Sequence, residues 1–298
     1  MKVFVTGGSG QTGPAIIREL VRSGHEVTGL ARSDASATTL ERLGAQIVRG
    51  SLVDLDILAA AASSADGVVH MAYGGDYADP EGMILRDVEA VTALGKALEG
   101  SDKPFIVTSG TLVLPNGALA SEDTAPDRDG PAAARLAGED ACLAFVDKGV
   151  RAIVLRLAPT VHGPNDHGFI PMLIGTARDK QVSAYVGDGS NEWPAVHRDD
   201  AAVLYRLALE GAPAGSVLHA VAENVQFADI ATTIGQGLDV PTARLTSEDA
   251  AAHYVSPFMA LIYAADAPAS SARTRQLLDW EPRHTDLLDD LAQGDYLR

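Results

Sequence analysis

A glycine-rich turn directly after the first apolar run constrains the fold of this chain more than any other feature. The turn reads T-G-G-S-G-Q-T-G, and it lies between the run Lys2–Thr6, typical of a buried strand, and Pro14, which suits the first turn of a helix. Glycine permits the tight turn and lets the backbone approach a pyrophosphate at the positive end of the helix dipole. The sequence therefore predicts a dinucleotide site, with contacts from Gly7, Gly10, Gln11, Thr12 and Gly13.

The first half of the 298-residue chain alternates short β-branched runs with longer segments of helical period. This alternation predicts an α/β fold with a doubly wound parallel sheet. The predicted strands are Lys2–Thr6, Glu26–Leu30, Gln46–Arg49, Gly67–Met71, Phe105–Ser109 and Ala152–Leu157.

The rhythm changes after Leu157, where prolines and glycines interrupt the chain. We predict a dinucleotide-binding core over residues 1–160, to which strands and helices from about 196–222 also belong. Residues 161–298 mainly form a smaller, mixed, substrate-binding lobe. Helical periodicity returns at Asp199–Leu209, Phe227–Ile234, Ser247–His253 and Ser271–Leu278.

Charge and cysteine content exclude several classes of partner. Lysine and arginine number 23 against 40 acidic residues, a net charge of −17, which repels nucleic acid and anionic lipid. Cys142 is the only cysteine, so an intramolecular disulfide framework and a cysteine zinc cage are excluded. The N-terminal apolar run is too short for a signal peptide, and no stretch is long enough to span a bilayer. We expect a soluble, cytoplasmic protein.

The end of the second predicted strand distinguishes between two nicotinamide dinucleotides. An NAD site places Asp or Glu here against the ribose hydroxyls. This chain has Ala31, Arg32 and Ser33, of which the last two suit a 2′-phosphate. We predict NADP as the cofactor; NAD is the alternative if Arg32 is only a solvated loop residue.

Further segments carry a family resemblance over nearly the whole chain. They are G-S-L-V-D at 50–54, V-H-M-A at 69–72, V-T-S-G-T-L-V at 107–113, G-P at 163–164, G-D-G at 187–189 and V-H-R-D-D at 196–200. The chain resembles the extended short-chain dehydrogenase/reductase superfamily, also called the NAD-dependent epimerase/dehydratase family. The resemblance implies a Rossmann fold and further cofactor contacts at Ser51, Leu52, Met71, Ala72, Pro159 and Val161.

The chain departs from this family where the chemistry takes place. Relatives carry a Tyr-x-x-x-Lys pair, with a Glu four residues after the Lys. Matching that Glu to Glu139 places Arg135 at the Lys position and Pro131 at the Tyr position. The usual proton donor is therefore absent, and Ser109 and Thr111 flank the place of the assisting hydroxyl.

These substitutions leave a reduced set of catalytic candidates. Thr111 or Ser109 is predicted to orient a substrate oxygen, with water as the ultimate acid, although each hydroxyl could instead satisfy local backbone groups. Arg135 could hold the cofactor ribose but cannot relay a proton. His162 is a candidate acid or a structural histidine. His162, Asp166 and His167 together suggest a metal site, but we predict none.

Aromatic residues indicate the class of substrate. Trp193 stands where sugar-nucleotide enzymes of the resembled family have a diphosphate-clamping Arg. We predict hydride transfer between nicotinamide and a small, rather apolar carbonyl, alcohol or imine, by a monomer or homodimer. The alternatives are a non-catalytic NADP sensor and a nucleotide-sugar epimerase or dehydratase. The predicted substrate contacts are Tyr73, Phe169, Tyr185 and Trp193, within a larger apolar set that adds Met172, Tyr254, Phe258, Met259 and Tyr263.

Overall fold

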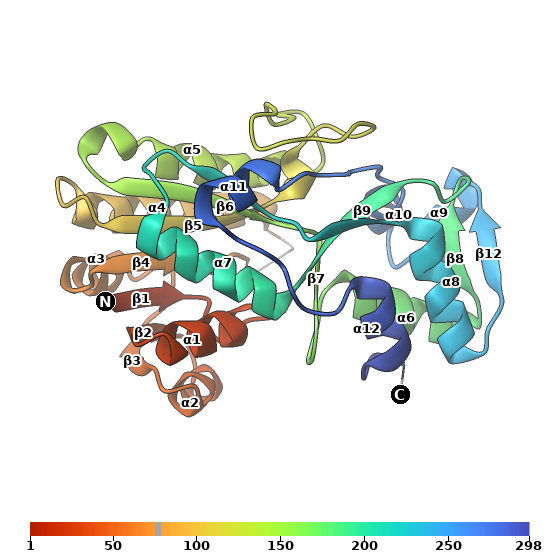
Figure 1. Ribbon diagram of the computed structural model, residues 1–298, viewed down its shortest axis with the longest axis horizontal. Coiled ribbons are helices and arrows are strands. Elements are labelled where there is room, and N and C mark those ends of the chain that lie inside the picture. The colour runs from red at the N-terminus through yellow and green to blue at the C-terminus, as the bar shows by residue number, and fades with distance from the viewer. Residues whose placement is uncertain (75–78, 298) are drawn as a thin grey trace.

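The structure, a computed structural model, describes residues 1–74 and 79–297 (Figure 1). Its centre is a seven-stranded sheet in the order β10-β6-β5-β4-β1-β2-β3, with every pair parallel. The predicted strands are confirmed to within a residue at each end, and β10 comes from later in the chain. The strands are β1 (Lys2–Thr6), β2 (Glu26–Ala31), β3 (Gln46–Arg49), β4 (Gly67–His70), β5 (Pro104–Gly110), β6 (Arg151–Leu157) and β10 (Val217–Ala220).

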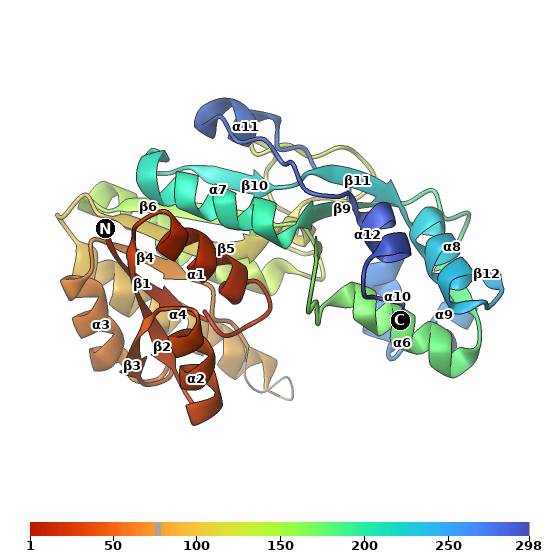
Figure 2. The same ribbon diagram turned by 60° about the horizontal axis from the view of Figure 1, so that its bottom comes forward.

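Helices cover both faces of this sheet (Figures 1 and 2). One apolar core joins the sheet to α1 (Gly13–Arg22), α2 (Asp34–Arg42) and α7 (Arg198–Gly211). A second core joins the opposite face to α3 (Leu55–Ser64), α4 (Pro80–Leu98) and α5 (Leu136–Leu143). Because both faces are covered, the strands are continuous apolar runs rather than alternating ones. The doubly wound sheet predicted from the sequence is confirmed.

The smaller part of the molecule has its own mixed sheet and its own core. β7 (Thr160–His162) pairs in parallel with β9 (Glu192–His197), which pairs antiparallel with β11 (Glu223–Gln226). β8 (Ser183–Val186) and β12 (Thr242–Leu245) form a separate parallel pair. The helices here are α6 (Phe169–Lys180), α8 (Phe227–Leu238), α9 (Ser247–His253), α10 (Pro257–Tyr263) and α12 (Leu287–Gln293), while α11 (Ala272–Leu278) returns to the large sheet beside α7 (Figure 2).

The helices α6, α10 and α12 were not predicted. Pro171 is one of the prolines that interrupt the chain after Leu157, yet it lies in the first turn of α6, where a missing backbone N–H costs no helical hydrogen bond. No helix in the described ranges has both the length and the apolar character that a membrane span requires.

Candidate active site

A pocket of about 970 Å³ lies at the carboxyl ends of the central strands. The strand order reverses between β1 and β4, and in parallel sheets ligands bind at such a switch point. The pocket contains most of the predicted cofactor residues, but neither Pro159 nor Val161. It is lined by Gly7, Gly10, Gln11, Thr12, Gly13, Arg32, Ser33, Ser51, Leu52, Met71, Ala72 and Tyr73, together with residues that were not predicted, including Ser36, Arg86, Thr108, Leu157 and Tyr205.

Two glycines of the turn are required by close packing. Gly7 has a positive φ of 73°, and a Cβ on it would lie 2.6 Å from the backbone nitrogen of Ala72. A Cβ on Gly13 would lie 2.4 Å from the Gly8 carbonyl oxygen. A Cβ on Gly10 would meet only the Gly7 carbonyl oxygen, at 3.2 Å. The first two glycines therefore allow the turn to form, whereas a side chain at Gly10 would take up space in the pocket.

The edge of the pocket at the end of β2 carries hydroxyls and a cation. Ser33 is the N-cap of α2 and forms a capping box with Ser36, with the Ser36 amide donating to Ser33 Oγ over 3.2 Å. Arg32 is exposed beside them, and no described residue forms an ion pair with it. Asp34, the nearest acid in the chain, is paired with Arg49 at 2.7 Å. This edge therefore presents a free guanidinium and a helix N-terminus to a ligand.

A buried chain of polar groups runs from β1 to α4. The Ala72 amide donates to Thr6 Oγ1 over 3.3 Å, and Thr6 Oγ1 lies 2.8 Å from His70 Nδ1. His70 Nε2 lies 3.2 Å from Asp87 Oδ1. These contacts are all satisfied if Thr6 donates to Nδ1 and Nε2–H donates to Asp87. The Asp87 carboxylate is thus held in place, 4.0 Å from the Arg135 guanidinium.

Arg135, which the family resemblance aligns with the Lys of the Tyr-x-x-x-Lys pair, lies between the end of β5 and Tyr73. Its Nη2 donates to the Thr108 carbonyl, and its Cζ lies 3.6 Å from the centroid of the Tyr73 ring. One turn later, Glu139 receives two hydrogen bonds from Arg156, at 3.0 and 2.7 Å, within the protein. This buried pair anchors α5 to β6, and so fixes the helix end that carries Arg135.

Ser109 and Thr111 are buried at the end of β5. Neither hydroxyl has a hydrogen-bond partner among the described residues. A buried hydroxyl without a partner is costly, so such atoms often face a ligand or a water molecule. Neither residue is part of the pocket wall, although Thr108, adjacent to Ser109, is.

His162 occupies a structural position. Its side chain is 1% exposed, and its Nδ1 lies 2.8 Å from Asp290 Oδ2 of α12. Its ring also meets the edge of His197, with centroids 5.3 Å apart. This placement does not support a catalytic acid, because the imidazole is already engaged and does not line the pocket. It attaches β7 to the C-terminal helix.

Most of the aromatic residues predicted to contact the substrate instead belong to, or pack against, the core of the smaller lobe. Trp193 is fully buried, and its Nε1 donates to the Ala265 carbonyl over 3.1 Å. It therefore has no surface for a substrate, which corrects the prediction for this residue. Phe169 and Tyr185 are half-buried and pack against the same core, and neither lines the pocket. Of the predicted substrate contacts, Tyr73 is the one on the pocket wall.

The C-terminal segment contacts the glycine-rich turn through Asp166, an acid that the sequence analysis considered only as a metal ligand. Gln11 Nε2 donates to Asp166 Oδ1 over 2.5 Å, and the Tyr296 hydroxyl donates to Asp166 Oδ2 over 2.8 Å. Burial raises the pKa of Asp166 above its usual range. Nothing in the local sequence around Tyr296 indicated this contact, because the two partners are 130 residues apart.

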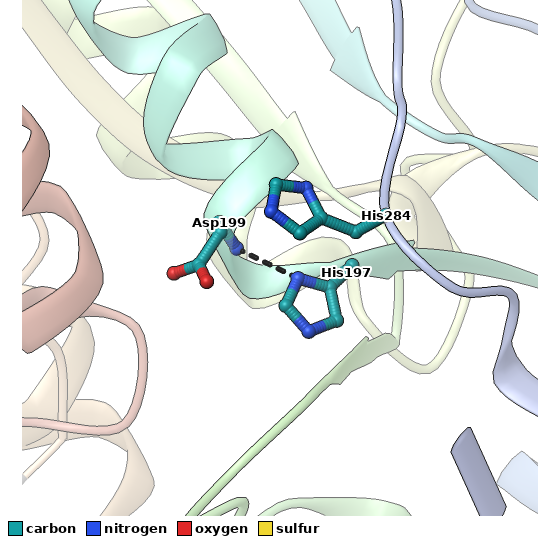
Figure 3. Close-up of side chains that lie close together, drawn as sticks. All are labelled: His197, Asp199 and His284. Carbon is teal, nitrogen blue, oxygen red and sulfur yellow. Dashed lines mark hydrogen bonds between the residues drawn. The ribbon is translucent and has the colours of Figure 1, made fainter.

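A histidine cluster lies at the junction of the two lobes (Figure 3). Ligand atoms of His197, Asp199 and His284 lie within 4.8 Å of one another. However, the two rings are stacked, 4.6 Å apart and 10° from parallel, so that their in-plane lone pairs do not converge on one ion. Figure 3 shows the Asp199 amide donating to His197 Nδ1, at 3.2 Å, which caps α7. This cluster is a helix cap and a lobe junction.

Comparisons with known proteins agree with this architecture. The family model described as NAD dependent epimerase/dehydratase family matches residues 3–220. An uncharacterized protein of Schizosaccharomyces pombe is 44% identical over 99% of this chain and 100% of its own length, and one of Saccharomyces cerevisiae is 42% identical over 98% of each chain. A 2-alkyl-3-oxoalkanoate reductase of Stenotrophomonas maltophilia is 28% identical over 72% of this chain and 67% of its own length.

Solved structures show the same fold. A UDP-glucuronic acid 4-epimerase from Bacillus cereus, in complex with UDP-glucuronic acid and NAD, superimposes with a TM-score of 0.77 at 22% identity. The match covers 99% of this chain and 98% of the epimerase.

Proposed function

Because the chain belongs to the NAD dependent epimerase/dehydratase family, we propose that it is an NADP-dependent reductase of a small, rather apolar carbonyl compound. The observation that carries the proposal is the pocket at the switch point, which joins the glycine-rich turn, the end of β2 and the end of β4 in one cavity. The reductase among the relatives favours reduction as the reaction class. The reverse oxidation of an alcohol and the reduction of an imine use the same site.

The described residues fit the cofactor. The open space at Gly10 and the start of α1 suit the pyrophosphate. Arg32 and the hydroxyls of Ser33 and Ser36 suit a 2′-phosphate, and no acidic residue is among the described residues of the pocket wall to hold an unmodified ribose. Ser51, Leu52, Met71 and Ala72 would border the adenosine, and the loop at Pro159 and Val161 would approach the carboxamide. NADP is therefore the preferred form.

The chemistry divides between cofactor and protein. When bound, the reduced nicotinamide supplies the hydride. We assign the orientation of the substrate oxygen to Ser109 or Thr111, whose hydroxyls have no partner among the described residues. Arg135 would hold the ribose and contribute positive charge near the developing alkoxide. Residues 1–160 and about 196–222 would bind the cofactor, and residues 161–298 would mainly cover the substrate.

A titration and an assay test this proposal. Isothermal calorimetry should show NADP binding at least about tenfold more tightly than NAD, the effect of roughly 1.4 kcal/mol from one charge-assisted contact. Loss of NADPH absorbance should follow addition of a ketone, an aldehyde or an imine from a panel. Thr111→Val and Ser109→Ala should slow this turnover. Equal affinities would contradict the NADP preference; tight NADPH binding without any turnover would instead favour a sensor.

A further inference from the structure

We propose that Tyr73 is the proton donor of this site, and that the end of β4 supplies the phenol missing from the start of α5. This inference rests on the proposed carbonyl reduction. It replaces the solvent water as the acid with a side chain on the pocket wall. Sequence matching could not find it, because the replacement phenol lies on a different element from the one it replaces.

Among the residues that the structure describes, two phenols line the pocket, and their surroundings differ. Tyr205 of α7 is fully buried, and its hydroxyl lies 2.7 Å from Thr108 Oγ1. Burial raises the pKa of Tyr205 well above its usual range, so this phenol holds its proton. Tyr73 is half-buried, and no described residue forms a hydrogen bond with its hydroxyl. Of these two described phenols, Tyr73 is the one that remains available to a substrate.

Arg135 supports a proton transfer from Tyr73. Its guanidinium lies over the Tyr73 ring, with Cζ 3.6 Å from the centroid, and it stays protonated at any working pH. A fixed positive charge on the ring face favours the phenolate that remains after the proton has left. In this arrangement the residue at the family's Lys position still acts on a phenol, although the phenol comes from another element.

The buried chain of polar groups helps to fix the positions of Tyr73 and Arg135. Ala72, next to Tyr73, is bound to Thr6 through its amide, and the chain continues through His70 to Asp87. Asp87 Oδ2 lies 4.0 Å from Arg135 Nη1, and the Thr108 carbonyl accepts from Nη2. The backbone beside the phenol is therefore hydrogen-bonded to a network that ends at Asp87, and Asp87 forms a long ion pair, without a hydrogen bond, with the guanidinium that stacks on the phenol. Asp87 acts as a positioning residue for Arg135.

The proposed step transfers one hydride and one proton to the carbonyl group. A hydride from the reduced nicotinamide dinucleotide forms the new C–H bond at the carbonyl carbon. The π electron pair of the carbonyl moves to its oxygen, the Tyr73 Oη–H bond breaks, and an O–H bond forms on the product alcohol. The dinucleotide is oxidised and the carbonyl is reduced. The Tyr73 phenolate then takes a proton from water, with its charge compensated by Arg135 until that occurs.

Steady-state kinetics with NADPH and the best carbonyl of the panel test the role. Tyr73→Phe keeps the ring stacked on Arg135 but removes the proton, so kcat should fall at least about a hundredfold while KM and the NADPH Kd stay within about threefold. Tyr205→Phe is the matched variant for the other phenol, and the fall in kcat that it causes should be at least about tenfold smaller. Asp87→Asn should lower kcat with little change in KM, and circular dichroism should show that each variant is folded.

A second measurement does not depend on turnover. Tetranitromethane nitrates accessible phenols, and peptide mass spectrometry locates the modified residue. NADPH should protect Tyr73 from nitration while Tyr185, which is half-buried and does not line the pocket, reacts as before, and Arg135→Leu should weaken this protection. If NADPH binds but leaves Tyr73 equally reactive, the proposed placement is wrong whether or not a substrate is known.

The two proposals fail in different ways. If the wild-type protein binds NADPH but reduces none of the panel, reduction itself is in doubt, and the nitration result still decides whether Tyr73 faces the cofactor. If the wild-type protein turns over and Tyr73→Phe does so at the same rate, only the Tyr73 assignment is overturned. If Tyr205→Phe lowers kcat as much as Tyr73→Phe does, the Tyr73 assignment is also overturned.

Discussion

Gly7 and Gly10 belong to one motif, yet the structure gives them different tasks. Gly7 combines a φ of 73° with backbone contact against Ala72, whereas a Cβ on Gly10 would meet one carbonyl oxygen only, 3.2 Å away. The motif spacing alone does not separate these roles. The distinction depends on β4, whose end packs against the turn although it is more than 60 residues away in the chain.

Substituting each glycine should therefore give a different result. Gly10→Ala should unfold at nearly the wild-type temperature but bind NADP at least about tenfold more weakly, because the methyl group would occupy the space that we propose for the pyrophosphate. Gly7→Ala should lose about 1–3 kcal/mol of unfolding free energy through backbone strain and the clash with Ala72. Thermal unfolding and calorimetry on both variants measure the two effects. A Gly10→Ala protein with unchanged NADP affinity would contradict this view of the turn.

Arg32 provides a second test at the scale of one side chain. Arg32→Ala should weaken NADP binding about tenfold and leave NAD binding almost unchanged, because only NADP carries the 2′-phosphate that the guanidinium would hold. Arg42→Ala is the matched control: it removes an exposed arginine from the last turn of α2, away from the pocket wall. If both variants lose the same affinity, the effect reflects net charge rather than a specific contact.

At the scale of elements, α5 shows how a short helix is held without a strong amphipathic pattern. It has eight residues, and its inner face carries Glu139, which pairs with Arg156 of β6. Both side chains are 4% exposed. The pair was not predicted from the sequence, where Glu139 served only to align the chain with the family pattern. Its structural effect is to fix the helix end that bears Arg135.

Breaking this pair should be costly. Glu139→Gln should lower the unfolding free energy by about 3–5 kcal/mol, because it leaves the Arg156 charge buried without a partner. Urea unfolding measures this change. Asp140→Asn on the same helix, which breaks the exposed pair with Arg128 of the preceding loop, should change stability far less. Equal losses from the two variants would indicate that the Arg156 charge is not sequestered from water.

For the whole molecule, buried histidines make stability depend on pH. Burial lowers the pKa of His197 and of His219 from the ordinary value of 6.5. Below about pH 6.5 the unfolded chain binds protons at these positions that the folded protein does not bind, so this contribution to stability is lost as the pH falls. Asp166 and Glu223, whose pKa values burial raises, act in the opposite direction, but mainly at lower pH.

The unfolding free energy should therefore fall between about pH 7.5 and about pH 5.5. His197→Asn should flatten this dependence, since asparagine still caps a helix but does not titrate. Urea unfolding at the two pH values measures both effects. If the wild-type protein is equally stable at both pH values, or if the unfolding free energy of His197→Asn changes with pH as much as that of the wild type, His197 does not contribute to the pH dependence.

The sequence alone predicts the parallel sheet, which the structure confirms, and names most of the residues that line the pocket at the carboxyl ends of the strands. It can do so because strand periodicity and the glycine turn are local patterns that depend on neighbouring residues. Through the family resemblance it also predicts that the usual phenol is missing. The tertiary structure decided which residues are available to a ligand. It buried Trp193 and His162, and it stacked Arg135 on Tyr73 from another element. Those outcomes depend on packing between segments far apart in the chain, which no local pattern specifies.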